Sequence, residues 1–171
     1  LTASNNRRAE RFLMERWNRG DLSTLTFTDL LINSNYDRFR AEFWPLLLER
    51  KELVFFIANY RAQKTASDYN VIPIPDNAFD DYENVKSSVM NELVELPDGA
   101  IVCSSASSMS NVWGHALLLR RPDITFFDVG SSINPFIGLG ESGRKYLANS
   151  NQKKFRRLIS NFLNRDQRIR W

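Results

Sequence analysis

The sequence contains one cysteine and one histidine, and this scarcity excludes several classes of protein. Cys103 has no second cysteine with which to form an internal disulfide, so the chain is not a disulfide-stabilised scaffold. Cys103 and His115 together cannot supply the full set of nitrogen and sulfur ligands that a structural zinc site requires. A lone reduced cysteine is typical of a reducing compartment, and we expect a cytoplasmic location.

Long apolar runs are also absent from the chain. No run approaches the ~18 residues that span a membrane, and the first residues lack the pattern of a signal peptide. The 43% of apolar and 25% of charged residues indicate a globular rather than a disordered chain, and 171 residues suffice for one domain with a core. Because the sequence opens at Leu1 without a methionine, we expect it to be a fragment of a longer chain.

The net charge of +3 hides a strongly basic C-terminal segment. Asp166 is the single acidic residue between Arg144 and Arg170, whereas lysines and arginines recur throughout that stretch. Such a segment is compatible with phosphates, an anionic membrane or nucleic acid, and equally with a helix whose basic face is in water. No aromatic residues interleave with its basic face, so nucleic acid is not an expected partner.

The first 50 residues are expected to form a helical lead-in. Apolar residues at helical spacing predict one helix over Ser4–Asn18. A second helix follows the stripe Tyr36, Phe39, Phe43 and Leu47, and Pro45 predicts a kink or a break in it. After residue 50 the hydrophobic pattern changes to short continuous runs.

Residues 51–136 are expected to form a βαβ core. Four short apolar runs predict strands that are covered on both faces, and amphipathic stretches over residues 85–94 and 109–117 predict helices between them. Prolines push the second strand toward a sheet edge or an early end. The alternation predicts one Rossmann-like α/β domain with a mostly parallel sheet and helices on both faces, followed by a basic helical segment over 137–171. The strand runs are "LVFFIA" (53–58), "VIPIP" (71–75), "AIVCS" (100–104) and "ITFFDV" (124–129).

Polar or small residues stand where the predicted strands end. In an open parallel sheet the carboxyl ends of the strands form the edge at which ligands bind. The candidate site residues on this edge are Asn59, Ser104, Ser105, Ser107, Asp128, Gly130 and Ser131.

These candidates have two interpretations. The serines after Cys103 either cap the following helix or, with its free N–H groups, bind an anion such as a pyrophosphate. Asp128 either caps its own loop or accepts a hydrogen bond from a sugar hydroxyl and acts as a base. Gly130 would allow a backbone conformation or a close approach that other residues do not.

Several familiar motifs are missing from the chain. The serine-rich segment after Cys103 is neither a G-x-G-x-x-G fingerprint nor a P-loop, and the chain has no G-x-S-x-G elbow, so no serine hydrolase is indicated. The stretch "GLGESG" (138–143) superficially resembles a phosphate loop, but it follows no clear strand and is expected to be a flexible connection. Ser105, His115 and Asp128 can be drawn as a triad, but their spacing gives no reason for them to converge. The acidic stretch "PDNAFDDYEN" lacks EF-hand spacing and is expected to be a solvated loop before a helix.

Four segments, in this order, carry a resemblance to a known family. They are "INSNYDRFRAEFWPLLLERKELVFFIANYRA", "PIPDNAFDDYENV", "GAIVCSSASSMSNVWGHALLL" and "ITFFDVGSSINPF". Over roughly residues 33–136 the chain resembles the C-terminal part of GT-D-type glycosyltransferases, Rossmann-like enzymes that transfer a sugar from a nucleotide donor. The resemblance implies that Asn59, Ser104, Ser105 and Ser107 contact donor or acceptor, that Gly130 and Ser131 form the loop at the sugar, and that Asp128 is catalytic.

The chain departs from that family at one motif. Enzymes of the family carry an Asp-x-Glu metal motif near the start of the domain, whereas Asp21 here has no glutamate two residues later. The resemblance implies Mn²⁺ or Mg²⁺, but the sequence identifies no ligands for the ion. Two hypotheses therefore stand: a glycosyltransferase that extends a glycan or polysaccharide, and a non-catalytic Rossmann-like binding module of a larger protein.

Overall fold

The computed structural model describes residues 35–65 and 68–140, together with Thr2–Ala3, Glu15, Thr26–Phe27 and Leu31. The strands β1 (Thr2–Ala3) and β2 (Thr26–Phe27) form a small parallel pair. Apart from Glu15, the helix expected over residues 4–18 lies outside the described residues, as does the basic segment from residue 141 onward.

The centre of the fold is a four-stranded sheet in which every neighbouring pair is parallel. Its strands lie in the order β4 (Asn70–Ile74), β3 (Val54–Asn59), β5 (Ile101–Ser104) and β6 (Thr125–Asp128). All four predicted strands are confirmed, and so is the Rossmann-like α/β class. The strand with prolines, β4, lies at an edge of this sheet, as its sequence predicted.

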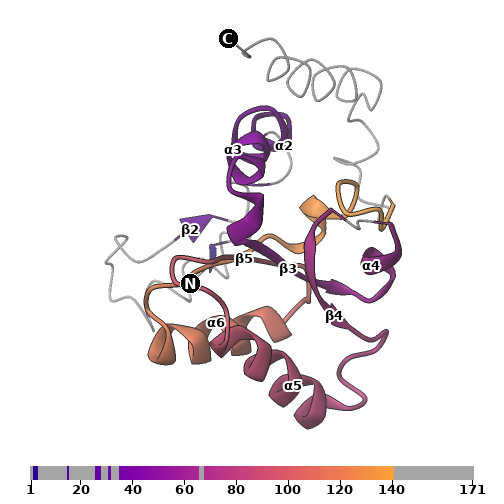
Figure 1. Cartoon of the computed structure of the whole chain (residues 1–171), viewed down its shortest axis with the longest axis vertical. Helices are drawn as coiled ribbons and strands as arrows, with labels where there is room; N and C mark the ends of the chain where they lie inside the picture. The colour runs from indigo at the N-terminus through magenta and orange to yellow at the C-terminus, as the bar shows by residue number, and fades with distance from the viewer. Residues whose placement is uncertain are drawn as a thin grey trace.

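Helices cover both faces of the sheet (Figure 1). The two longest helices among the described residues, α5 (Tyr82–Val94) and α6 (Met109–Arg120), lie together on one face. The other face carries α2 (Tyr36–Arg38), the π-helix η4 (Phe39–Phe43), α3 (Trp44–Leu48) and, beyond β6, the 3-10 turn η6 (Gly130–Ile133). Two short elements flank β3, the 3-10 turn η5 (Lys51–Leu53) and α4 (Arg61–Thr65).

The predicted kink at Pro45 takes the form of a π-helical segment. Helical turns run without interruption from α2 through η4 into α3, and Pro45 occupies the first turn of α3. The N–H of Trp44 donates to the carbonyl of Phe39, five residues earlier, which is the π-type spacing. Since proline has no N–H and its ring crowds the preceding turn, the wider turn before Pro45 lets the helix continue through it.

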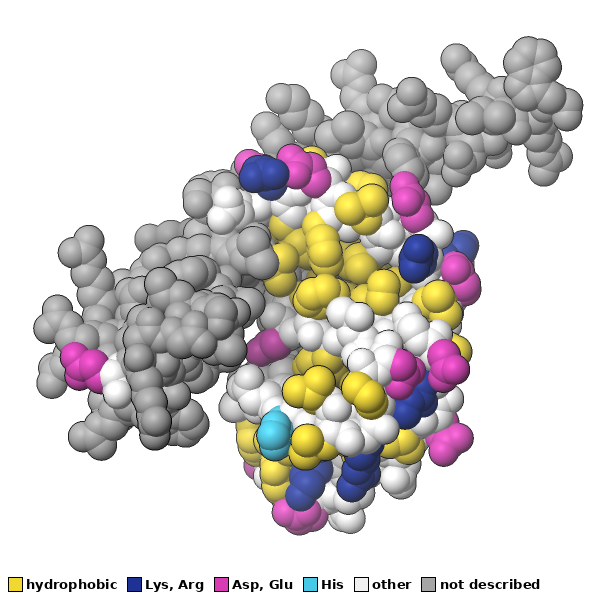
Figure 2. Space-filling view, turned by 90° about the vertical axis from the view of Figure 1, so that its left-hand side faces the viewer, with side chains coloured by type: hydrophobic (Ala, Val, Ile, Leu, Met, Phe, Trp, Pro, Cys, Tyr) yellow, Lys and Arg dark blue, Asp and Glu magenta, His cyan; other side chains and the backbone are white. Residues whose placement is uncertain are grey.

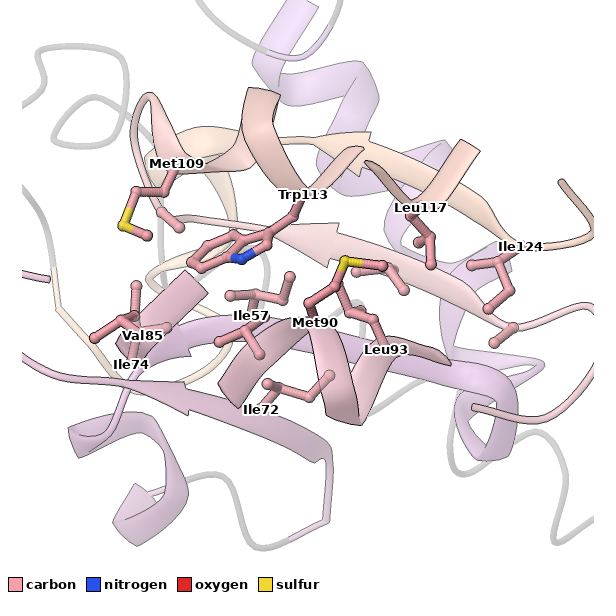
Figure 3. Packing of buried hydrophobic residues seen from close by; sticks show 14 residues of the cluster. Ile57, Ile72, Ile74, Val85, Met90, Leu93, Met109, Trp113, Leu117 and Ile124 are labelled. Carbon is pink, nitrogen blue, oxygen red and sulfur yellow. The ribbon is translucent and has the colours of Figure 1, made fainter. Parts of the chain in front are cut away.

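The face beneath α5 and α6 is packed with aliphatic side chains and one tryptophan. Figure 3 shows Ile57 of β3 and Met90 of α5 beside the ring of Trp113 of α6. Trp113 is fully buried, and its Nε1 donates to the backbone carbonyl of Lys86 over 3.1 Å. This layer holds α5 and α6 at a fixed height over the sheet and so fixes where α6 begins.

The opposite face is packed with aromatic rings. Trp44 is 0% exposed and stacks on Phe136, with 4.1 Å between ring centroids and 18° between planes. Its ring also contacts Phe56 of β3 and Tyr69, which precedes β4. The Nε1 of Trp44 has no hydrogen-bond partner among the residues that the structure describes. The continuous helix formed by α2, η4 and α3, here called the lead-in helix, is therefore part of the core.

Gly114 lies where α6 packs closely against β6. A Cβ on Gly114 would lie 3.0 Å from Cδ1 of Phe126. We expect Gly114→Ala to lower the free energy of unfolding by about 1 kcal/mol, because overpacking costs about 1–3 kcal/mol and the gain in helix propensity returns only about 1 kcal/mol. Urea unfolding measures this change. The double variant Gly114→Ala/Phe126→Leu should remove the clash, and a single variant more stable than the wild type would contradict the prediction.

No helix within the described residues is long and apolar enough to cross a membrane.

Candidate functional site

The order of the strands creates a reversal point between β3 and β5. The chain leaves β3 for β4 on one side and then crosses back to place β5 on the other side. At such a point the connections after neighbouring strands diverge and leave a crevice at the carboxyl ends. The backbone ladder extends to this edge, because the N–H of Ser105 donates to Ile57 over 2.8 Å and that of Val129 donates to Ser104 over 3.0 Å. The candidate residues therefore lie along one rim.

Asp128 ends β6 on this rim. Its Oδ1 accepts a hydrogen bond from the backbone N–H of Gly130 over 3.3 Å. The residue as a whole is exposed, yet its carboxyl has lost part of its hydration, and this desolvation raises the pKa of Asp128 above the usual range. The N–H of Gly130 and the hydroxyl of Ser110 on α6 lower the pKa of Asp128 and so limit this rise. A carboxylate with a raised pKa is a better proton acceptor, which suits a general base.

Gly130 allows the loop after β6 to turn back onto Asp128. Its φ is +51°, a left-handed conformation that glycine adopts at little cost. The following turn is fixed by Ser132, whose hydroxyl donates to the carbonyl of Val129 over 2.7 Å. The hydroxyl of Tyr36 in turn donates to the carbonyl of Ser132 over 3.1 Å. Ser131, a predicted site residue, lies partly buried within this turn.

The three candidate serines, Ser104, Ser105 and Ser107, lie in different environments. Ser104 is fully buried and its hydroxyl lies 2.8 Å from that of Ser110, so it faces α6 rather than solvent. Ser105 is partly buried, and its hydroxyl donates to Oδ1 of Asn134 over 3.0 Å. Ser107 is exposed and has a φ of +55°, which is uncommon outside glycine. Ser105 and Ser107 are thus the two of the three that a ligand at the rim could reach.

None of these serines caps α6 in the expected way. The N-cap position is Ser108, and its side chain makes no capping hydrogen bond. Instead the first turn closes through backbone bonds, since the N–H of Ser110 donates to Ser107 over 3.1 Å and that of Asn111 donates to Ser108 over 3.2 Å.

Asn59 belongs to a second polar cluster on the same rim. Its Oδ1 accepts from Nε of Arg61 over 2.7 Å, and its Nδ2 donates to Oδ1 of Asp76 over 2.8 Å. Arg61 and Asp76 close the triangle with an ion pair of 2.8 Å. Both charged side chains are more than half exposed, so the pair itself adds little stability. Its effect is to hold the Asn59 amide in one orientation.

Sequence reasoning missed Ser110, Asn134, Arg61 and Asp76 as site residues. Arg61 and Asp76 follow β3 and β4 directly, so the rule that placed Asn59 on the rim could have included them. Ser110 and Asn134 lie further from the strand ends, and only the fold brings them to the rim.

Ser105, His115 and Asp128 do not form a catalytic triad. Ser105 bonds to Asn134, and His115 lies exposed on α6. Figure 2 shows the histidine at the surface among hydrophobic side chains. Serine-hydrolase chemistry therefore has no support in this geometry.

The described residues do not fit a metal ion. Across residues 35–65 and 68–140, no group of three or more His, Cys, Asp or Glu side chains could hold one. The carboxylates after β4 form a turn and the start of α5, in agreement with the predicted solvated loop. The expected Mn²⁺ or Mg²⁺ stays a prediction for which these residues supply no site.

Cys103 is expected to be chemically inert in the folded protein. It lies in β5, is 0% exposed, and burial raises the pKa of its thiol to about 12. Since only the thiolate reacts with disulfide reagents, we expect no labelling of the native protein near pH 8, and labelling of its one thiol after denaturation. Absorbance after addition of an aromatic disulfide reagent measures both. Rapid reaction of the native protein would show that β5 opens readily.

Comparison of the chain with models of protein families, with curated proteins and with solved structures found no match.

Proposed function

We propose that the protein is a glycosyltransferase domain that moves a sugar from a nucleotide-sugar donor to a glycan or polysaccharide acceptor. The observation that carries the proposal is the position of Asp128, a partly desolvated carboxyl at the carboxyl edge of a parallel sheet. The serine and asparagine groups beside it are donors and acceptors of the kind that recognise sugar hydroxyls. The resemblance to GT-D-type enzymes points to the same chemistry.

The proposed step is a displacement at the anomeric carbon of the donor. An acceptor hydroxyl oxygen forms the new bond to that carbon, while the bond to the nucleoside diphosphate breaks and its electron pair leaves with the diphosphate. The proton of the acceptor hydroxyl passes to the carboxylate of Asp128, which acts as general base. The N–H of Gly130 keeps that carboxylate in place while it receives the proton.

Calorimetric titration tests the donor directly. UDP-, GDP- and CMP-sugars are titrated into the full chain with and without Mn²⁺, and the fold is checked by circular dichroism. We expect one nucleotide class to bind, and the same donor to release its nucleoside diphosphate when a glycan acceptor is added. A folded protein that binds none of the three classes would refute the proposal.

A non-catalytic binding module is the second candidate function. The observation in its favour is the cluster of Asn59, Arg61 and Asp76, whose polar groups satisfy one another rather than pointing into an open site. For such a module we expect ligand binding without turnover, and no effect of Asp128→Asn on the affinity. Nucleotide release that depends on Asp128 would decide for the enzyme.

A further inference from the structure

The side chains of Ser105 and Asn134 join two connections at the rim. Ser105 follows β5 directly, and its N–H donates to the carbonyl of Ile57 in β3 over 2.8 Å. Ser105 therefore stands between the two strands at which the strand order reverses. Its hydroxyl donates over 3.0 Å to Oδ1 of Asn134, the residue that ends η6. This bond holds the amide of Asn134 beside the end of β5.

The backbone around Asn134 is fixed on both sides. Its N–H donates to the carbonyl of Ser131 over 3.2 Å, and its own carbonyl accepts from the N–H of Leu139 over 2.9 Å. Ile133 and Ile137 are both 0% exposed and anchor this segment in the core. Asn134 itself is only partly buried. Its amide is thus held in place and still open to a ligand.

The direction of the bond between Ser105 and Asn134 decides what the pair offers to a ligand. The single proton of the Ser105 hydroxyl goes to Asn134, so the Ser105 oxygen keeps lone pairs with which it can accept. The Asn134 oxygen accepts this bond, whereas its Nδ2 carries two hydrogens and has no partner among the described residues. The pair therefore offers a donor and an acceptor side by side.

A sugar hydroxyl fits this pair better than a phosphate does. A hydroxyl can accept from Nδ2 of Asn134 and donate to Oγ of Ser105, whereas the oxygens of an ionised phosphate only accept. Charge favours the same ligand. Residues 104–111 and 128–140 contain no lysine, arginine or histidine, and their one charged residue is Asp128. A carboxylate on this loop repels an anion and leaves a neutral hydroxyl unaffected.

We propose that Asn134 is a specificity-determining residue that donates a hydrogen bond to a hydroxyl of the transferred sugar, and that Ser105 orients its amide and accepts from the same hydroxyl. This inference rests on the proposed function, because the sugar is that of the nucleotide-sugar donor. It gives the site one contact that recognises the sugar rather than the nucleotide.

The test compares Asn134→Ala with Ser105→Ala, because both variants remove the same hydrogen bond and only the first removes the donor to the sugar. Calorimetry measures the affinity of the full chain for UDP-, GDP- and CMP-sugars and for UDP, GDP and CMP. For the sugar nucleotide that binds, the affinity should fall about tenfold in Asn134→Ala and about threefold in Ser105→Ala, the range of one net hydrogen bond. The matching nucleotide without the sugar should bind both variants like the wild type. Equal losses in the two variants, or equal losses for the two ligands, would overturn the inference.

Asn134→Asp separates the contact with the sugar from the joining of the two connections. Its carboxylate still accepts from Ser105 but has no hydrogen to donate. We expect Asn134→Asp to melt close to the wild type and to bind the sugar nucleotide at least as weakly as Asn134→Ala does. Wild-type affinity in Asn134→Asp would mean that the amide nitrogen has no ligand, and the inference would fall.

The inference and the proposed function can fail separately. If a sugar nucleotide binds with an affinity that depends on Asn134 but no acceptor receives the sugar, the function fails and the contact with the sugar stands. If the wild type transfers sugar and Asn134→Ala binds the donor equally well, the function stands and the inference is overturned. If the folded wild type binds no sugar nucleotide, both are overturned.

Discussion

Replacing Asp128 by asparagine is expected to lower the rate of sugar transfer at least a hundredfold while the protein stays folded. The variant removes the proposed base, whose contribution is typically about 10²–10⁴ in rate. The amide oxygen of asparagine can still accept the bond from the Gly130 N–H, so the loop keeps its anchor. Release of nucleoside diphosphate with a saturating acceptor measures the loss. A variant with wild-type turnover would show that Asp128 is not the base.

The same variant should change how stability depends on pH. Burial raises the pKa of Asp128 in the folded protein, so the folded state binds its proton more tightly than the unfolded state does. Stability from this group is therefore largest below the unfolded pKa and falls as pH rises to the folded value. Asparagine has no such proton, so the melting temperature of Asp128→Asn relative to wild type should rise through that window and level off above it. A scan of melting temperature from about pH 3 to pH 8 covers the window.

Truncation of Trp44 is expected to have the largest effect on stability. Trp44→Ala would remove a fully buried ring that stacks on Phe136 and contacts Phe56. Loss of a buried tryptophan costs about 3–5 kcal/mol, a large part of the stability of a domain of this size. Chemical unfolding monitored by far-UV circular dichroism measures the loss. A change below about 1 kcal/mol would mean that the aromatic layer does not hold the lead-in helix.

A conservative pair of variants separates ring packing from the indole N–H. Trp44 leaves its buried Nε1 without a partner among the described residues, so Trp44→Phe removes an unsatisfied donor together with part of the ring. Trp113 donates its Nε1 to the carbonyl of Lys86, so Trp113→Phe loses a hydrogen bond as well as volume. We expect Trp44→Phe to destabilise the protein less than Trp113→Phe. The reverse order would show that the Trp44 N–H does find a partner in solution.

The strands could be predicted because each is a local pattern. A short apolar run bounded by polar residues needs no information from elsewhere, and all four such runs are strands of the sheet. The rim followed from them, because parallel strands bring their carboxyl ends to one edge. The position of Asp128 on the rim could therefore be predicted from the sequence.

The contacts between side chains in the site could not be predicted from the sequence. The approach of Ser110 to Asp128 depends on the length and tilt of the connection before α6, which no local pattern encodes. Ser104 was predicted to contact a ligand, yet it is buried and its hydroxyl lies 2.8 Å from that of Ser110, because α6 packs over this end of β5. The π-helical turn before Pro45 likewise depends on the fit of the helix to the sheet.

The hydrogen bond from Tyr36 to Ser132 joins two positions that are 96 residues apart. Such a contact can form only after the chain between the two residues has been brought together. Its entropic cost of loop closure therefore falls late in folding. The loop's own bonds, from Gly130 to Asp128 and from Ser132 to Val129, are local and do not need this contact. The bond from Tyr36 therefore fastens an already formed turn to the helix α2, and it reports the docking of that helix rather than the shape of the loop beside Asp128.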